Sequence, residues 1–342
     1  MAIEFRREPR TSSFLDPMDN FAEKSLPIEF RYDPLTMDMG VLVEFRARQP
    51  EKPDLSQLIA KSMEMGCPFC PESVGKVTPK FIPAICPEGK IKVGEATVFP
   101  NPMPYMPHNA ITVLGSQHFV GLTEFTPKML YNAFLASQSY FEKLHEYDPE
   151  VKYCCIMWNY MPPANSSQLH PHLQVLGSYS PLAYHQKLLE VSQEYRNETR
   201  ANCWSDFIAE EKRLQERYIA TLGNTVWLTS FVPRSGFFDV MAIFEGRDAI
   251  ISLSLDDIDA FSHGLTRVFK YMDDENFYSF NLCLYSGIPK EDAFWTQARI
   301  IPRVTTPPLG ISDVGNLTLL GDTRLIFRFP ESVCQELRPY FG

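Results

Sequence analysis

The chain lacks a long hydrophobic run, and it lacks an excess of positive charge. No stretch reaches the roughly 18 apolar residues of a membrane span, and the N-terminal residues have no long apolar core, so we expect no membrane partner. Its 32 Lys and Arg residues are outnumbered by 42 Asp and Glu residues, which gives a net charge of −10. Proteins that follow a nucleic-acid backbone need a positive surface, so we expect no nucleic-acid partner either.

The eight cysteines do not form the regular framework of a small secreted protein. Cys154 and Cys155 are adjacent in an apolar run, and Cys86, Cys203, Cys283 and Cys334 are isolated. These six are typical of reduced, mostly buried thiols, and they predict a cytoplasmic protein. A length of 342 residues with 44% hydrophobic content is enough to fill two cores.

The segment His170-Pro-His-Leu-Gln174 places two imidazoles and a carboxamide at alternating positions of a predicted strand. Side chains two residues apart on a strand point the same way, so all three polar groups converge on one ligand. A neutral imidazole can attack phosphorus, and a neighbouring carboxamide can hydrogen-bond the phosphate oxygens. The pattern indicates a nucleotidyl-histidine intermediate. Taken alone, it also fits two structural histidines, or two ligands of a hydrolytic metal.

Cys67-Pro-Phe-Cys70 forms a knuckle from which two thiolates reach one tetrahedral zinc ion. His118, after an apolar strand-like run, and His170 can supply the other two ligands of a Cys2His2 site. A redox dithiol and two unrelated buried thiols are the alternatives. A redox motif is expected within a βαβ pattern, and none surrounds Cys67.

With these two motifs in this order, the chain resembles the galactose-1-phosphate uridylyltransferase family of the histidine-triad superfamily. Asp33-Pro-Leu-Thr36, Arg46-Ala47 and Val98-Phe-Pro-Asn101 are similar to further family segments. The resemblance implies that His172 is the nucleophile and that Gln174 stabilises the transferred group. It also implies a zinc site and a set of nucleotide- or phosphate-binding residues. The zinc ligands are Cys67, Cys70, His118 and His170, and the binding residues are Arg46, Phe69, Asn101, Asn159, Ser166, Ser167 and Gln174.

An internal repeat relates the two halves of the chain. The segment 101–114 is echoed by 231–244, and aligning 169–176 with 294–301 puts Trp295 opposite His170, Gln297 opposite His172 and Arg299 opposite Gln174. The second copy therefore keeps the apolar framework and lacks the nucleophile and the metal pair. Gln297 and Arg299 are predicted to face an acceptor phosphate or sugar, or else to be solvated strand residues.

The predicted fold class is α+β, with tandem duplicated histidine-triad-like domains, each an antiparallel sheet with packed helices. Residues 1–200 form the domain with the nucleophile and zinc, and residues 201–342 form the degenerate acceptor-side domain. Strands are expected near 41–45, 95–99, 110–114, 153–159, 171–177, 225–232, 238–244, 278–284 and 298–302. Helices are expected near 125–147, 255–272 and 330–339, the last against the first lobe or a second subunit. Residues 180–222 are predicted to be helical, with Tyr218 and Leu222 on an apolar face.

The resulting functional prediction is a zinc nucleotidyltransferase that works by double displacement. A nucleoside diphosphate sugar, UDP-sugar above all, donates the nucleotidyl group, and a sugar 1-phosphate or another phosphate accepts it. The resemblance also implies a homodimer. The alternatives are a dinucleoside polyphosphate or nucleoside diphosphate sugar phosphorylase, and a nucleotide-binding zinc protein without catalytic activity.

Overall fold

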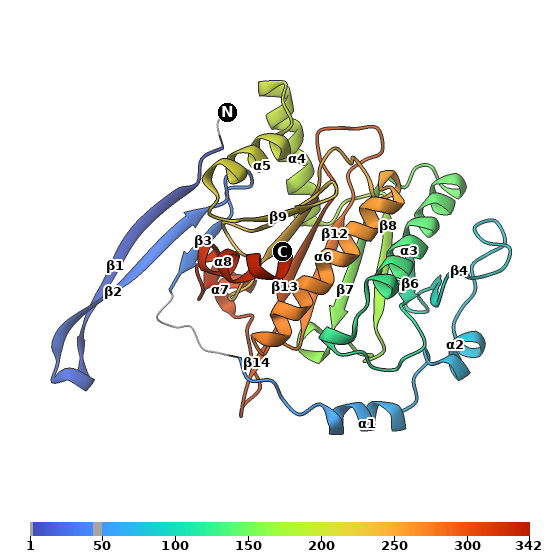
Figure 1. The fold of residues 1–342 in the computed structure, drawn as a ribbon, viewed down its shortest axis with the longest axis horizontal. Coiled ribbons are helices and arrows are strands. Elements are labelled where there is room, and N and C mark those ends of the chain that lie inside the picture. The colour runs from blue at the N-terminus through green and yellow to red at the C-terminus, as the bar shows by residue number, and fades with distance from the viewer. Residues whose placement is uncertain (1–2, 44–49) are drawn as a thin grey trace.

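A computed structural model describes residues 3–43 and 50–342, and a ten-stranded antiparallel sheet forms its centre (Figure 1). The strands in spatial order are β4 (Ile91–Val93), β5 (Ala96–Pro100), β6 (His108–Val113), β8 (His172–Ser178), β7 (Tyr153–Tyr160), β12 (Phe280–Tyr285), β13 (Gln297–Pro302), β11 (Val240–Phe244), β10 (Thr225–Thr229) and β9 (Tyr218–Leu222). The expected strands after residue 90 are therefore present.

The two halves of this sheet have the same topology. The order β4-β5-β6-β8-β7 is repeated as β9-β10-β11-β13-β12, and β7 pairs with β12 where the halves meet. Helix α3 (Pro127–Tyr147) follows the third strand of the first half, and α6 (Leu255–Asp274) follows the third strand of the second. The predicted fold class, a tandem duplication of one antiparallel unit, is confirmed. The division near residue 200 stays a prediction, because the hydrogen-bonded ladder runs from one half into the other.

Local sequence determines where the two long helices begin. The Thr126 hydroxyl accepts a hydrogen bond from the backbone N–H of Met129, and Pro127 follows at the first helical position. At α6, Ser254 and Asp257 form a reciprocal capping box. Both helices match the expected ranges to within two residues at each end.

Alternation along the strands separates two faces of the sheet. One face packs on α3 and α6, which lie side by side in Figure 1, and forms the larger core. The second half of the other face is covered by α4 (Ala183–Thr199) and α5 (Cys203–Leu214). His172 and Gln174 lie on this second face, because it carries the odd-numbered residues of β7, β12 and β13 and the even-numbered residues of β8.

A second sheet was not expected from the sequence. It contains β1 (Arg6–Asp16), β2 (Ala22–Tyr32), β3 (Met39–Leu42) and β16 (Arg324–Ile326), so the first strands lie beside the end of the chain. The β1–β2 hairpin extends from the body as an arm (Figure 1). Polar residues and the prolines Pro9 and Pro27 hide its strand pattern. The predicted strand at 41–45 corresponds to β3, although residues 44 and 45 lie outside the described chain.

The prediction of helix through residue 222 was wrong. Helix α5 ends at Leu214, Gln215 adopts a left-handed conformation with φ 56°, and residues Tyr218–Leu222 form the edge strand β9. An apolar residue every three or four positions fits one helix face, but pairing with β10 satisfies this backbone and buries Ile219.

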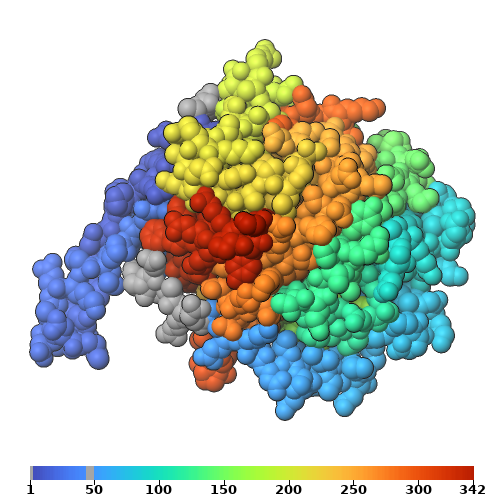
Figure 2. Space-filling model, in the orientation of Figure 1, coloured from blue at the N-terminus to red at the C-terminus, as the bar shows by residue number. Residues whose placement is uncertain are grey.

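The last helix, α8 (Pro330–Phe341), is present as expected. It packs on α6, β9 and β10 of the second half, and Glu331 in its first turn also bonds Arg31 of β2. Figure 2 shows this C-terminal segment seated between the α5–β9 region and the surface of α6. The remaining helices and strands are short: α1 (Ser56–Glu64), α2 (Pro71–Val77), α7 (Asn316–Leu319), β14 (Thr305–Thr306) and β15 (Ile311–Ser312). Within residues 3–43 and 50–342, no helix is both long and apolar enough to cross a membrane.

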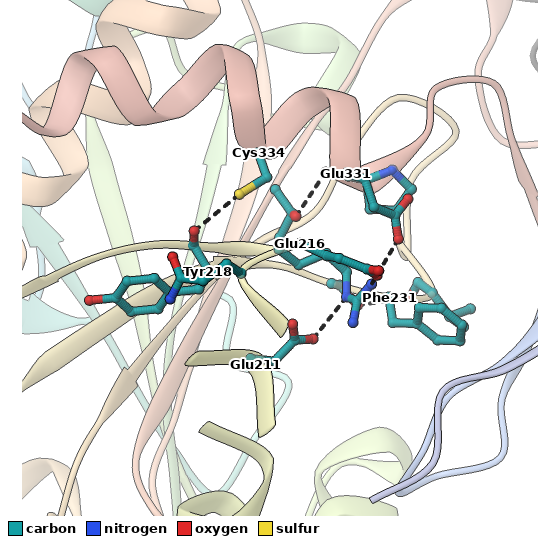
Figure 3. Close-up of polar contacts among 12 residues, drawn as sticks. Glu211, Glu216, Tyr218, Phe231, Glu331 and Cys334 are labelled. Carbon is teal, nitrogen blue, oxygen red and sulfur yellow. Dashed lines mark hydrogen bonds and ion pairs between the residues drawn. The ribbon is translucent and has the colours of Figure 1, made fainter. Parts of the chain in front are cut away.

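A buried ionic cluster joins the base of the arm to the C-terminal helix. Figure 3 shows the part of it around Glu211, Glu216 and Glu331. The Arg217 side chain is fully buried and donates to Glu211 at 2.8 Å and to Glu331 at 2.8 Å. Arg31 from β2 donates two further bonds to Glu331, at 2.9 and 3.0 Å. These charges therefore hold β2, the end of α5 and the start of α8 together, although the three segments are far apart in the sequence.

Replacing Arg217 by Met should lower the free energy of unfolding by about 3–5 kcal/mol, because Glu211 would be left buried without its cation. Arg213→Met is the control, since that side chain is 66% exposed and pairs with Glu210 on the surface. Its cost should be below about 1 kcal/mol. Urea denaturation measures both values, and equal losses would contradict the importance of the cluster.

Candidate active site and metal centre

Four predicted ligands come together from three separate parts of the chain. One donor atom from each of Cys67, Cys70, His118 and His170 lies within 4.8 Å of the other three. The Cys70 sulfur is 3.3 Å from His118 Nδ1, and both sulfurs are 3.7 Å from His170 Nδ1. His172 is not in this group, so the two histidines of the His-Pro-His segment do not share a metal site here.

The outward-facing nitrogens fix the tautomers of the two histidine ligands. His170 Nε2 donates to the Gly115 carbonyl at 2.9 Å. His118 Nε2 lies 2.7 Å from the Ser62 hydroxyl, which itself donates to the Ile59 carbonyl. The hydroxyl must therefore accept from His118. In both rings Nδ1 is left unprotonated toward the sulfurs, as a metal ligand requires.

The protonation of the cluster also fits a cation site. Burial raises the pKa of the Cys70 thiol to about 12, with the neighbouring Cys67 contributing, so two thiolates need a bound cation for stability. Burial lowers the pKa of His170 to about 4, which keeps this ring neutral at pH 7. Two sulfur and two nitrogen donors fit a tetrahedral metal ion. The six cysteines outside this cluster are buried free thiols, as expected.

His172 is held in one tautomer by its own strand. Its Nδ1 donates to the His170 carbonyl at 2.9 Å, so Nε2 carries the free lone pair. Burial lowers the pKa of this imidazole, which favours the neutral form. Phe69, from the Cys67–Cys70 knuckle, packs against the ring at a centroid distance of 5.1 Å. The Cys2His2 cluster therefore contacts the candidate nucleophile in two ways, through the Phe69 ring and through the backbone of His170-Pro171-His172.

Gln174 is oriented by two asparagine side chains. Its Oε1 accepts from Asn109 Nδ2 at 3.2 Å and from Asn101 Nδ2 at 3.4 Å. The amide NH2 of Gln174 therefore remains to donate to a ligand. Asn101 was expected at the nucleotide, whereas Asn109 was not predicted from the sequence. Alternation on β6 places Asn109 on the face that carries Ile111, which pairs with Gln174, and this could have identified it.

The remaining predicted binding residues are distributed around this face. Asn159 lies on β7 next to β8 and accepts a hydrogen bond from Asn281 at 2.7 Å. In the loop after η4 (Pro162–Ala164), the Ser166 hydroxyl donates to the Gln168 carbonyl, whereas Ser167 is exposed. Arg46 lies outside the described residues. The roles assigned to these side chains stay predictions.

The acceptor-side residues of the second half are buried. Gln297 is fully buried in register with Tyr285 and Ile243, and neither polar atom of its side chain has a hydrogen-bond partner among the described residues. The Arg299 guanidinium donates to Asp239, which neutralises its charge. Both side chains are therefore buried, so they are not solvated strand residues. Their contact with an acceptor stays a prediction.

Comparison with solved structures shows that the chain shares its fold with a GalT-like protein, an ADP-glucose phosphorylase and a uridylyltransferase, which confirms at the level of the fold the resemblance based on the motifs. An ADP-glucose phosphorylase from Arabidopsis thaliana, solved with bound ADP-glucose, superposes with a TM-score of 0.71 at 16% identity, covering 91% of this chain and 98% of that one. A GalT-like protein from Arabidopsis thaliana gives 0.69 at 16% identity, with 90% and 98% covered. A uridylyltransferase gives 0.65 at 15% identity, with 91% and 98% covered.

In sequence, the chain is 29% identical over 338 residues to an uncharacterized protein of Archaeoglobus fulgidus, covering 98% of each. No family model matches the chain.

The Cys2His2 cluster predicts one bound metal ion per chain. Cys70→Ser should lower the affinity for this ion at least tenfold, because a thiolate ligand is lost. Cys86→Ser is the control, since Cys86 is a buried thiol of the same half that lies outside the cluster. Elemental analysis after dialysis against a weak chelator measures the metal content. Equal retention by both variants would show that the four residues do not hold the ion.

Proposed function

We propose that this protein is a nucleotidyltransferase that works by double displacement through a nucleotidyl-His172 intermediate. The observation that carries the proposal is the pairing of His172, whose Nδ1 is held by the His170 carbonyl, with Gln174, whose Oε1 is held by two asparagines. A free imidazole lone pair and a free amide NH2 thus lie two residues apart on one strand face. Attack on phosphorus and stabilisation of its oxygens need these two groups.

In the first step, neutral His172 Nε2 attacks the α-phosphorus of a nucleoside diphosphate sugar. The P–N bond forms as the bond to the bridging oxygen breaks, and a sugar 1-phosphate leaves. In the second step, a phosphate oxygen of the acceptor attacks the same phosphorus and releases His172. The NH2 groups of Gln174 and Asn159 donate to the non-bridging oxygens in both steps. Positioning supplies most of the rate in such transfers.

We propose zinc as the ion of the Cys67, Cys70, His118 and His170 cluster, on the basis of its soft and borderline donors. When bound, zinc would fix the His170 ring and hence the backbone that presents His172. Four protein ligands leave no position for a water molecule, so the site is structural. This arrangement separates the proposal from a hydrolytic metal enzyme.

The donor is proposed to be a nucleoside diphosphate sugar, with a UDP-sugar as the first candidate. The fold is shared with a uridylyltransferase and with an ADP-glucose phosphorylase, so uridine and adenine nucleotides are both to be compared. A sugar 1-phosphate as acceptor gives a transferase, whereas inorganic phosphate gives a phosphorylase. The chemistry at His172 is the same in both.

The proposal is tested by intact-protein mass after brief incubation with UDP-sugars, ADP-sugars and dinucleoside polyphosphates, without acceptor. We expect an added mass of one nucleoside monophosphate residue on the native protein and none on His172→Ala. His108→Ala is the control and should form the adduct, because His108 lies on the opposite face of the sheet. Chasing the adduct with sugar 1-phosphate or with inorganic phosphate then identifies the acceptor.

The absence of an adduct with every donor, in protein that binds the donor and is fully loaded with zinc, would overturn this function. It would leave a nucleotide-binding zinc protein without catalytic activity.

We also propose that the protein is a homodimer. The tip of the β1–β2 arm exposes four large apolar side chains, Phe14, Leu15, Met18 and Phe21, at 41–91% of their area. A two-stranded hairpin is marginally stable in water, and contact with a second copy would bury this tip. Sedimentation should show a dimer that dissociates more readily when these four residues are replaced by Ser. A monomer at all concentrations would overturn the proposal.

A further inference from the structure

Two asparagines face each other on the central strands where the halves of the sheet meet. Asn159 of β7 pairs directly with Asn281 of β12. Asn281 Nδ2 donates to Asn159 Oδ1 at 2.7 Å. The carbonyl oxygen of Asn159 is therefore turned toward the second half. Its Nδ2 group has no acceptor among the described residues, so it is free to donate to a ligand.

The register of β7 with β8 locates this free amide group. Met157 pairs with Gln174, so Asn159, two residues further along the same face, lies next to His172 at the start of β8. Gln174 and Asn159 are therefore both neighbours of His172 on this face, Gln174 along β8 and Asn159 across on β7. Two amide donors beside a nucleophile suit the two non-bridging oxygens of one phosphate.

The orientation of Asn281 is determined by two groups, the Ala164 carbonyl and Arg303, which lies just beyond β13. Arg303 Nη1 donates to Asn281 Oδ1 at 2.8 Å. A guanidinium has only donors, so the oxygen of Asn281 must face it and the NH2 must face Asn159. That NH2 also donates to the Ala164 carbonyl at 3.0 Å, at the turn that precedes the Ser166–Ser167 loop. Asn281 thus makes two hydrogen bonds to the first half, one to Asn159 and one to the Ala164 carbonyl.

Arg303 is itself held in place by a buried carboxylate. Its Nε lies 3.0 and 3.1 Å from the two oxygens of Asp313, and its Nη2 donates to the same carboxylate at 2.9 Å. The Asp313 side chain is only 5% exposed. A chain of hydrogen bonds therefore runs from Asp313 through Arg303 and Asn281 to Asn159, which lies beside His172.

We propose that Arg303 is a positioning residue that acts through Asn281 to keep the NH2 of Asn159 turned toward the transferred phosphate. This inference rests on the proposed function. An amide can rotate by 180°, and the reversed Asn159 would present its carbonyl oxygen to an anion. Without Arg303, only the Ala164 carbonyl still holds Asn281 in this orientation, so Asn281 reverses more readily and Asn159 can follow. The half of the chain that lacks the nucleophile thus contributes to the phosphate site.

The test compares Arg303→Met with Arg328→Met in the zinc-loaded protein. The two arginine side chains are 17% and 18% exposed, and each binds carboxylates, but Arg328 contacts Glu275 and Glu336, away from the asparagines. Calorimetry measures binding of UMP and AMP and of uridine and adenosine. We expect Arg303→Met to lose roughly tenfold in nucleotide affinity and nothing in nucleoside affinity, since one charge-assisted hydrogen bond is affected. Arg328→Met should change neither.

Asn159→Ala should show the same selective loss, and the double variant Arg303→Met with Asn159→Ala should lose no more than Asn159→Ala alone. Asn281→Asp is a second test that keeps the bond to Arg303. Its carboxylate cannot donate, so it should reverse Asn159 and weaken nucleotide binding. In the double variant Asn281→Asp with Asn159→Ala, the change in nucleotide affinity relative to Asn159→Ala measures the effect of the added charge alone. This value is subtracted from the loss measured for Asn281→Asp.

The inference would be overturned if the losses of nucleotide affinity in Arg303→Met and Asn159→Ala added up in the double variant. It would also be overturned if Arg303→Met lost as much affinity for nucleosides as for nucleotides. Either result would show that Arg303 has only a structural role. An adduct on wild-type protein with unchanged nucleotide affinity in Arg303→Met would overturn it while leaving the proposed function intact. Selective loss without any adduct on wild-type protein would support the positioning role and refute the transferase. If wild-type protein binds no nucleotide, both fail.

Discussion

The antiparallel pairing of β7 with β12 is the contact on which the rest of the structure depends. Six residue pairs, from Phe280 with Tyr160 to Tyr285 with Cys155, join two similar five-stranded units into one sheet. Because side chains alternate along every strand, this single register assigns one face of both units to α3 and α6. The opposite face carries the candidate site. The same register places Asn159 opposite Asn281, so the two halves share a hydrogen bond at the centre of the sheet.

The second unit keeps the framework of the first and has a different chemistry. At the position of His172 it has Gln297, which is buried in an apolar cluster beneath α4 and α5. At the position of Gln174 it has Arg299, which is paired with Asp239. These substitutions leave one candidate reaction centre in the described chain. The second unit contacts the first through β12 at the junction, where Asn281 bonds Asn159, and its far edge carries α8, which buried charges hold in place.

One tripeptide connects metal binding with the candidate nucleophile. His170 gives Nδ1 to the Cys67–Cys70 cluster, while its backbone carbonyl accepts from His172 Nδ1. The Gly115 carbonyl and the Ser62 hydroxyl orient the two histidine ligands from outside. An ion held by these residues would therefore act on catalysis through geometry, by restricting the strand that carries His172.

The sequence by itself determined what depends on neighbouring residues. Alternation predicted the strands around His172 and Arg299, and helices were expected at the positions of α3 and α6. The Cys67–Cys70 knuckle and His170, together with His118 after an apolar strand, gave the four clustered ligands. Tertiary structure alone decided that Tyr218–Leu222 is an edge strand, that the first strands pair beside the last, and that Asn109, Asn281 and Arg303 orient amides at the site. The pairing of β3 with β16 and the amide contacts are produced by hydrogen bonds between residues 22 to more than 280 positions apart, which no local pattern encodes. Residues 218–222 form a strand because they pair with β10 at the edge of the sheet, which the helical spacing of their apolar residues does not reveal.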